Sequence, residues 1–402
     1  MFQMEISPRR AWKKLRRPGW WLLEIQKPRT GFGRRIHRLC RALRSLKGLI
    51  PGSRRVTADG TFVAFYDLGH WPITFDFLWF MVAADLERQR LGFRHLHFVF
   101  VPGSDWEAGP EVKSYYEVVD GAARRQRVYD VLVPATALLS ATAGLTLAGS
   151  RAEASRIVDR GSKRVFPDGY SPELPGGDWP YYKMVMDASR SHRTIPPLQA
   201  PQGARDWVKR WREAYCDGRP YVTITLRHFG YTPVRNSNLG AWGDFARELE
   251  GRGFCPVIVP ETHMTLDALP SELQGLQVFT ESAWQLHLRS ALYEGAYLNL
   301  GVNNGPLSLC ILNLRCRYII FKMIIEGETV AGLKALLERG IDPRQPLPFA
   351  SRFQRWVVEP DTLPTIRSEF EAMCRSIEEA EDSVTQPAGP EDPEKQPPGL
   401  NT

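Results

Sequence analysis

Residues 296–321 read AYLNLGVNNGPLSLCILNLRCRYIIF, and this stretch decides the fold class. Residues 296–300 predict a buried strand, residues 301–306 a turn, residues 307–312 a short helix and residues 317–321 a second buried strand. Two apolar strands that flank a helix are typical of a parallel sheet, because parallel strands need a crossover connection and are covered on both faces.

The residues before this stretch repeat the pattern. They predict strands at 221–226 and 254–259, and helices at 206–215, 241–250 and 282–294. Four strands therefore alternate with helices in the second half of the chain, which indicates a doubly wound α/β domain.

The first half contains a similar unit, with a strand at 61–66, a long helix at 73–89 and an apolar strand at 95–101. Weaker signals predict a helix at 112–126, a strand at 127–133, a strand at 145–148 and a helix at 151–159. Residues 166–202 are rich in Pro and Gly, and we interpret them as the connection between two domains.

The sequence thus predicts an α/β protein with two Rossmann-like, doubly wound parallel-sheet domains that face a cleft. Its 402 residues are more than one hydrophobic core usually supports. We expect an N-terminal arm over 1–55, domains over 56–200 and 201–380, and a polar, Pro-rich, disordered tail over 381–402.

Positive charge is concentrated in the arm. Residues 1–55 carry 16 Lys and Arg against Glu5 and Glu24, a net charge of +14, whereas the other 347 residues carry 36 basic and 43 acidic side chains. Residues 36–50 place arginines around an apolar stripe, which predicts a basic amphipathic helix. Such an arm suits an anionic membrane surface, or it packs on the acidic body. The acidic body disfavours nucleic acid as a partner.

Composition also predicts the compartment and the absence of a metal. The start of the chain has no apolar signal region, and no apolar run is long enough to span a membrane, so we expect a cytoplasmic protein, peripheral on the inner membrane face if the arm binds there. The six cysteines form no CxxC pair and have no His cluster beside them. We therefore expect reduced thiols and no structural zinc site. We also expect no other metal and no cofactor.

Three loops at predicted carboxyl ends of strands carry candidate site residues, because ligands bind there in open parallel sheets. In the first loop, Asn303 or Asn304 can cap the following helix, and the free N–H groups at Gly305 with the hydroxyl of Ser308 suit a phosphate or diphosphate. A capped turn without a ligand is the alternative.

The second loop follows the strand at 221–226. Arg227 and Arg235 can donate forked hydrogen bonds to an anionic group, and Asn236 adds a neutral donor. Lys322, just after the last strand, adds a cation at the same edge. The alternative is a solvated loop whose arginines meet carboxylates of the other domain.

The third loop, in the first half, contains Asp67 and His70. Either side chain is a candidate general base that activates a hydroxyl. The alternatives are that Asp67 caps a turn and that His70 is an ordinary surface residue.

Residues 300–308, LGVNNGPLS, followed by an apolar helix, resemble the donor-site segment of bacterial heptosyltransferase-like glycosyltransferases with the GT-B fold. That segment typically contains an aspartate, a small hydroxyl residue, Gly-Pro and a histidine. The loop after Leu226 is similar in placement to the loop that holds a donor diphosphate in GT-B enzymes. Asn303 stands where the family has its aspartate, and Ser308 stands where it has its histidine.

The resemblance implies an inverting, metal-independent transfer of a sugar from a nucleotide sugar to a glycan or lipid-linked acceptor. It places the acceptor on the first domain and the donor on the second. Arg227, Arg235 and the helix start at Gly305 would stabilise the leaving diphosphate. A sugar-nucleotide epimerase with the same fold is the alternative enzyme, and a non-catalytic scaffold protein is the alternative outside enzymes.

Overall fold

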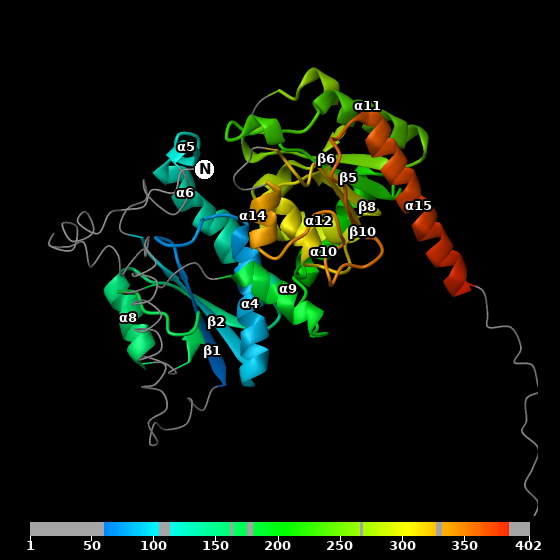
Figure 1. Cartoon of the computed structure of the whole chain (residues 1–402). Helices are drawn as coiled ribbons and strands as arrows, with labels where there is room; N and C mark the ends of the chain where they lie inside the picture. Colours follow the sequence, from blue (N-terminus) through cyan, green and yellow to red (C-terminus); the bar gives the residue numbers. More distant parts are fainter. Residues whose placement is uncertain are drawn as a thin grey trace, which may run out of the picture.

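The computed structural model describes residues 60–103, 113–160, 164–173, 175, 180–265, 268–326 and 332–385. Two parallel β-sheets, one in each half of the chain, are surrounded by helices (Figure 1). This α/β arrangement confirms the predicted fold class. The predicted arm over 1–55 and residues 386–402 of the predicted tail lie outside the described residues.

The first sheet has four parallel strands in the order β3-β2-β1-β4. They are β1 (Thr61–Asp67), β2 (His95–Val101), β3 (Thr142–Leu147) and β4 (Val165–Phe166). The carboxyl-terminal residues of β1 and β2 are buried, as expected for a parallel sheet with helices on both faces.

Helix α4 (Asp76–Leu91) and helix α9 (Tyr181–Arg190) lie on one side of this sheet, and α8 (Arg151–Arg160) lies on the other (Figure 1). The rings of Phe77 and Phe80 in α4 pack edge-on against Tyr66 of β1. Large aromatic side chains therefore hold α4, and with it the loop that precedes it, in a fixed place.

The strand predicted at 127–133 is wrong. Helix α5 (Lys113–Tyr116) and helix α6 (Gly121–Arg127) are followed without a break by a π-helical turn (Val128–Leu132), a short helix α7 (Val133–Ala135) and a 3₁₀ turn (Thr136–Leu138). A short run of apolar residues cannot distinguish a strand from a buried helix by its pattern, and here the helix continues.

The second sheet has six parallel strands in the order β10-β9-β8-β5-β6-β7. The strands are β5 (Tyr221–Thr225), β6 (Cys255–Val259), β7 (Gln277–Val278), β8 (Leu298–Val302), β9 (Tyr318–Phe321) and β10 (Gln354–Trp356). The prediction found the four longer strands and missed the short edge strands β7 and β10.

Six α-helices accompany this sheet in the described residues: α10 (Gln202–Tyr215), α11 (Leu239–Gly251), α12 (Leu286–Gly295), α13 (Ser308–Ile311), α14 (Leu333–Glu338) and α15 (Leu363–Thr385). Short 3₁₀ turns lie at 233–235, 262–265, 271–273, 280–283 and 305–307. Because α15 extends to Thr385, the first five residues of the predicted tail are helical.

The two halves share apolar packing. One core cluster contains buried side chains of both, among them Phe80 of α4 and Leu292 of α12, while a second contains Trp242 of α11 and Ile366 of α15. Within the stretch predicted as a connection, α9 packs on α4. The domain boundaries themselves stay a prediction.

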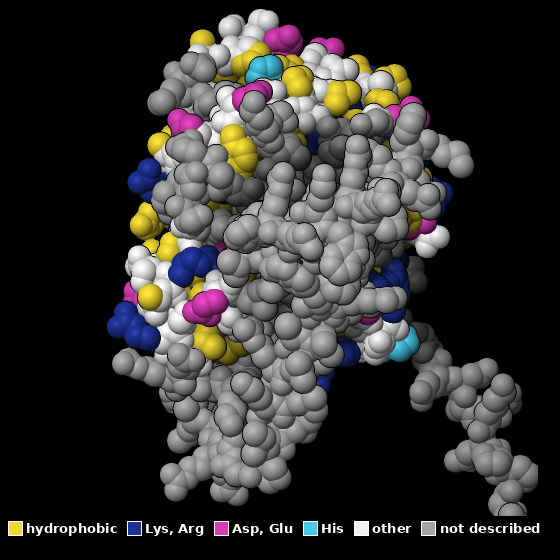
Figure 2. Space-filling model, turned by 60° about the vertical axis from the view of Figure 1, so that its left-hand side comes forward, with side chains coloured by type: hydrophobic (Ala, Val, Ile, Leu, Met, Phe, Trp, Pro, Cys, Tyr) yellow, Lys and Arg dark blue, Asp and Glu magenta, His cyan; other side chains and the backbone are white. Residues whose placement is uncertain are grey.

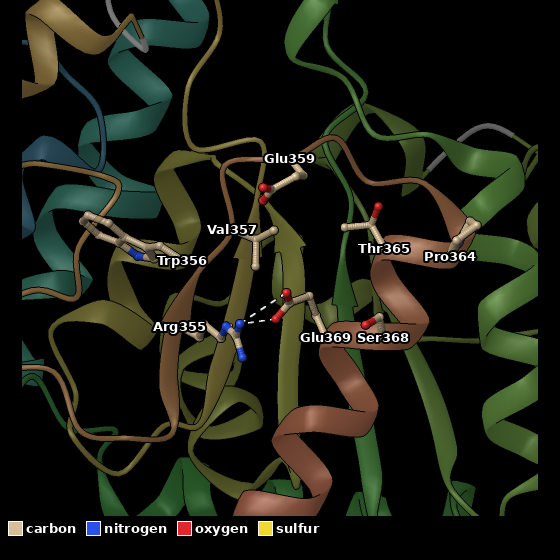
Figure 3. Close-up of a pocket in the computed structure, with 8 residues that line it drawn as sticks. All are labelled: Arg355, Trp356, Val357, Glu359, Pro364, Thr365, Ser368 and Glu369. Atoms are coloured by element: carbon tan, nitrogen blue, oxygen red, sulfur yellow. Dashed lines mark hydrogen bonds and ion pairs between the residues drawn. The ribbon is translucent and has the colours of Figure 1, made fainter.

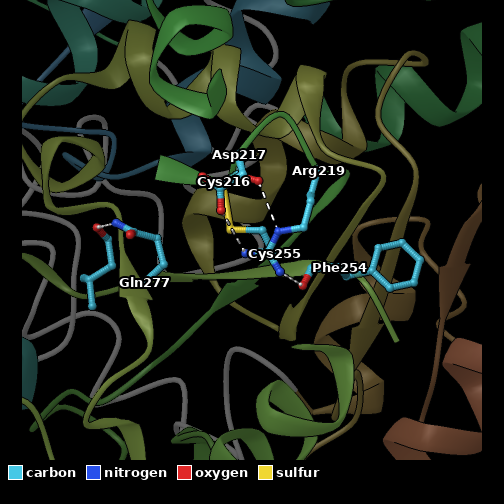
Figure 4. Close-up of a disulfide and its surroundings, with 7 residues drawn as sticks. Cys216, Asp217, Arg219, Phe254, Cys255 and Gln277 are labelled. Carbon is cyan, nitrogen blue, oxygen red and sulfur yellow. Dashed lines mark hydrogen bonds and ion pairs between the residues drawn. A yellow bond between two sulfur atoms is a disulfide. The ribbon is translucent and has the colours of Figure 1, made fainter. Parts of the chain in front are cut away.

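A disulfide joins Cys216, at the end of α10, to Cys255, the first residue of β6, with Cα atoms 5.6 Å apart (Figure 4). Both residues are buried. The expectation of reduced thiols is therefore wrong for this pair. The fold places the end of α10 beside the start of β6, and this brings together two cysteines that are 39 positions apart in the sequence. Cys310, Cys316 and Cys374 are free thiols.

In the part of the chain that the structure describes, no helix is long and apolar enough to cross a membrane. The described surface visible in Figure 2 mixes hydrophobic side chains with side chains of both charges.

Candidate functional site

The loops that follow the carboxyl ends of β1 and β8 meet in the structure. A Cβ atom placed on Gly305 would lie 3.1 Å from Cδ2 of Phe75, the residue directly before α4. One turn into α4, Nε1 of Trp79 donates a hydrogen bond to Oγ of Ser308 at 3.3 Å. The strand-end loops of the two sheets therefore face each other, as a ligand site shared by two such domains requires.

Asp67, a predicted base, is fully buried at the end of β1. Its Oδ1 accepts from the Gly69 amide at 3.1 Å and from Arg151 Nη1 at 2.9 Å, and its Oδ2 accepts from Arg151 Nη2 at 2.7 Å and from the Tyr170 hydroxyl at 2.8 Å. A carboxylate has about four acceptor positions, so no position is left for a substrate hydroxyl. The arrangement does not support Asp67 as the base.

The environment of Asp67 is that of a structural ion pair. Burial, with the negative charge of Asp67 as the next cause, raises the pKa of Tyr170 far above its ordinary value, so the phenol is a neutral donor. Arg151 also donates to the carbonyl of Pro102 at 3.0 Å. Asp67 and Arg151 thus join the ends of β1, β2 and the start of α8.

His70 lies in the same loop, half-buried. Its backbone amide donates to the carbonyl of Asp67 at 2.9 Å, and its ring stands edge-on to Trp71 with centroids 5.4 Å apart. Its role as a base stays a prediction.

Asp76, the first residue of α4, is the carboxylate that sequence reasoning left out of the predicted site. Its Oδ2 accepts from the Thr74 hydroxyl at 2.5 Å, and its Oδ1 accepts from the Tyr182 hydroxyl. Two of its about four acceptor positions are therefore used by described residues, and the residue is half-buried beside the Phe75–Gly305 contact. An acidic residue in a first helical turn is common for dipole reasons, so the sequence alone gave Asp76 no distinction.

The loop at 227–238 is held by its own hydrogen bonds. The Arg227 guanidinium, predicted to bind phosphate, donates through Nη1 to the Thr232 carbonyl at 3.0 Å and to Asn236 Oδ1 at 2.5 Å, and through Nη2 to the Tyr231 carbonyl. Arg227 is only 5% exposed. These contacts favour a role in shaping the loop over the predicted contact with a diphosphate, because most of its fork is used within the loop.

Arg235 and Asn236 stay candidates for donor binding. Nη2 of Arg235 donates to the carbonyl of Asn303 at 3.1 Å, which brings the two predicted phosphate-binding loops together. The Asn236 side chain bridges both backbone groups of Phe229, and the backbone carbonyl of Asn236 accepts from Lys322 Nζ at 2.7 Å.

Lys322, which follows β9, also contacts the loop at 227–238. Its Nζ lies 3.4 Å from Oδ1 of Asp361, which is 1% exposed. The other oxygen of Asp361, Oδ2, accepts from the backbone amide of Asn238 and from Nε1 of Trp242. The predicted cation is therefore already paired with a buried carboxylate. This pairing explains why a lysine follows β9, and its contact with a donor stays a prediction.

The turn at 303–308 confirms the predicted cap. Oδ1 of Asn304 accepts from the Leu307 amide at 3.2 Å. Nδ2 of Asn304 is buried and meets no acceptor within the described part of the chain. The helical segment that follows spans 305–311, and Gly305 is exposed beside Phe75. The phosphate site expected on the amides at Gly305 stays a prediction.

The described residues contain no group of three or more His, Cys, Asp or Glu side chains that could hold a metal ion. A pocket of about 480 Å³ lies between β10 and the first turns of α15 (Figure 3). Its lining includes an ion pair between Arg355 and Glu369, with Thr365 and Ser368 beside it. None of the predicted site residues lines this pocket.

No family model matches the sequence, and no curated protein matches it. The structure is similar to that of the E. coli ADP-heptose LPS heptosyltransferase II, with 9% identity, a TM-score of 0.48 and coverage of 79% of this chain and 99% of that chain. It is also similar to a family 9 glycosyl transferase of Veillonella parvula, with 9% identity, a TM-score of 0.41 and coverage of 65% and 79%. A third similar structure is the iron-containing dodecameric glycosyltransferase TibC of enterotoxigenic E. coli, with 12% identity, a TM-score of 0.36 and coverage of 81% and 78%.

These three similar structures are glycosyltransferases. At such identities the similarity concerns the path of the chain, and the role of each residue has to be argued from its own contacts.

Proposed function

We propose that the protein is a glycosyltransferase that moves a sugar from a nucleoside-diphosphate sugar to an acceptor hydroxyl. One observation carries this proposal, and it concerns the contact between Phe75 and Gly305 where the strand-end loops meet. Among the described residues, Asp76 beside this contact keeps acceptor positions, and the buried amide Nδ2 of Asn304 has no acceptor. A proton acceptor on one half and a hydrogen-bond donor on the other suit a displacement at a sugar carbon between them.

In the proposed reaction an oxygen of Asp76 takes the proton of the acceptor hydroxyl. The acceptor oxygen forms its bond to the anomeric carbon from the face opposite the diphosphate, and the bond from that carbon to the diphosphate oxygen breaks. The leaving nucleoside diphosphate keeps the electron pair, and donors from Asn304 and Arg235 stabilise its charge. The product is inverted at the anomeric carbon, and the step uses no metal ion.

The neutral hydroxyls of Thr74 and Tyr182 keep Asp76 in place without neutralising it. Burial, with the charge of Asp76 as the next cause, raises the pKa of Tyr182 well above its ordinary value, so Tyr182 stays protonated and donates. Asp76 is therefore held by two neutral donors, whereas Asp67 is paired with the guanidinium of Arg151.

A panel of nucleotide sugars tests the proposal directly. It includes ADP-heptose, because a TibC structure holds ADP-D-β-D-heptose. A ligand that binds only the folded state raises its melting temperature, and about 100-fold excess over the dissociation constant adds about 2.7 kcal/mol to the free energy of unfolding. We expect one nucleotide sugar to raise the melting temperature and to release free nucleoside diphosphate when an acceptor is present.

A non-catalytic protein with this fold is the second candidate, and the internal pairing of Asp67, Arg227 and Lys322 favours it. The same panel separates the candidates. Binding without release of nucleoside diphosphate in the presence of glycan and lipid-linked acceptors supports the non-catalytic protein. A modified nucleotide sugar formed without any acceptor supports the epimerase.

A lipid-linked acceptor would place the enzyme at the cytoplasmic face of a membrane, and the net charge of +14 over residues 1–55 supports that location. The full chain should then sediment with anionic liposomes at low salt and be released at high salt. A chain that stays in the supernatant at low salt excludes this part of the proposal.

A further inference from the structure

Aromatic and guanidinium groups connect the loop at 227–238 to the first half of the chain. The Phe229 ring contacts two arginines, with its centroid 6.0 Å from Cζ of Arg127 at the end of α6 and 6.0 Å from Cζ of Arg227. Nη1 of Arg127 also donates to the hydroxyl of Tyr115. The Tyr115 ring meets the Tyr231 ring edge-on, with centroids 5.4 Å apart. Residues of α5 and α6 thus contact two successive aromatic side chains of this loop.

Inside the loop these contacts lead to the candidate donor-binding side chains. The Phe229 amide donates to Asn236 Oδ1 at 3.1 Å, and Asn236 Nδ2 donates to the Phe229 carbonyl at 3.2 Å. Arg235, the neighbour of Asn236, donates to the Asn303 carbonyl. A displacement of Phe229 therefore disturbs Asn236, because two hydrogen bonds pair the Phe229 backbone with the Asn236 side chain. Arg235 precedes Asn236 in the chain, so it is disturbed as well.

We propose that Arg127 and Tyr115 are positioning residues for nucleotide binding. They hold Phe229 and Tyr231, and through them they fix Arg235 where it meets the diphosphate of the donor. The inference rests on the proposed function, and it adds that nucleotide affinity depends on the half that carries none of the candidate donor-binding residues. By linkage, a bound nucleotide strengthens the contact between the halves by the same free energy.

The first test compares two arginines of α6 in the full chain. Arg127→Ala removes the cation from the Phe229 and Tyr115 rings and should weaken binding of the nucleoside diphosphate about 5–10-fold, since two cation–π contacts and one hydrogen bond are lost. Arg125→Ala, an exposed neighbour on the same helix, should leave the dissociation constant unchanged. Calorimetric titration with the nucleoside diphosphate of the best nucleotide sugar measures both.

Conservative variants separate positioning from a loss of folding. Arg127→Lys keeps the positive charge over the ring, and Tyr115→Phe keeps the ring and loses only the hydroxyl. Both should bind nucleotide with affinities between those of the wild type and Arg127→Ala, at a melting temperature close to that of the wild type. Wild-type affinity in Arg127→Ala overturns the proposal.

Hydrogen exchange tests the contact without a ligand. In the unliganded protein, amides of residues 227–238 should exchange faster in Arg127→Ala than in the wild type, and unchanged exchange overturns the inference. If the wild type binds none of the nucleotides, the proposed function fails, and the exchange result still decides whether Arg127 orders the loop.

Discussion

Asp67 and Asp76 lie nine residues apart in the connection from β1 to α4, and their surroundings are opposite. Asp67 is 0% exposed and accepts four hydrogen bonds, two of them from the guanidinium of Arg151. Asp76 is half-buried and accepts from two neutral hydroxyls. The first carboxylate is saturated and stabilises the fold, whereas the second keeps capacity for a substrate. The comparison teaches that the partners of a carboxylate, more than its place beside a strand end, decide its role.

The largest expected effect concerns Asp76. Asp76→Asn keeps the size and one of the two acceptor oxygens of the side chain and removes its basicity, so turnover should fall about 10²–10⁴-fold. Binding of the nucleoside diphosphate should stay within about twofold. Steady-state rates of nucleoside diphosphate release measure the first, and titration measures the second. Asp187→Asn, on the exposed side of α9, is the matched control.

Removal of the ion-pair partner of Asp67 should lower the free energy of unfolding. Arg151→Met leaves the buried carboxylate without its cation, and the free energy of unfolding should fall by about 2–4 kcal/mol. The arginine side chain is 34% exposed, so the loss should stay below the upper end reported for fully buried pairs. Arg190→Met breaks an exposed pair with Asp187 and should cost less than about 1 kcal/mol in urea unfolding. Equal losses in the two variants would contradict the structural role of Asp67.

The contact beside Asp76 gives a third, smaller effect. A Cβ on Gly305 would meet Phe75 at 3.1–3.2 Å, so Gly305→Ala should lower the free energy of unfolding by about 1–3 kcal/mol. Gly251→Ala, at the last residue of α11, meets nothing within 4 Å and should stabilise by up to about 1 kcal/mol. Thermal unfolding of the pair checks whether the strand-end loops of the two sheets are in contact in solution. If both substitutions stabilise, the loops are further apart than the structure has them.

The smallest effect concerns His97, which lies near the amino-terminal end of β2 in the first sheet, away from Asp67 and Asp76. Burial lowers the pKa of His97 below its ordinary value of 6.5, and Nε2 of this residue hydrogen-bonds with the Thr146 hydroxyl at 2.9 Å. The unfolded chain therefore binds more protons at His97 below pH 6.5, so stability from this group is complete above pH 6.5 and is lost as the pH falls through the folded-state pKa. His97→Gln should flatten the pH dependence of the melting temperature between pH 5 and 7, and an unchanged profile would contradict this.

The sequence predicted the sheets well, because strand periodicity is local. It failed at residues 127–133, where an apolar run continued a helix, and it missed β10, which is only three residues long. It also placed the candidate residues at the correct strand ends. It could not predict their partners, because Arg151 lies 84 residues from Asp67 and Asp361 lies 39 residues from Lys322. Whether a charged side chain is free for a ligand is therefore a tertiary property.

Release of nucleoside diphosphate from the nucleotide sugar that binds best, measured with the wild type and with Asp76→Asn under saturating donor, tests the central claim most directly. Catalysis by Asp76 predicts acceptor-dependent release by the wild type, a loss of about 10²–10⁴-fold in the variant, and equal nucleotide affinity in the two proteins. Equal rates in the two proteins, or no release by the wild type with any donor and acceptor, would contradict it.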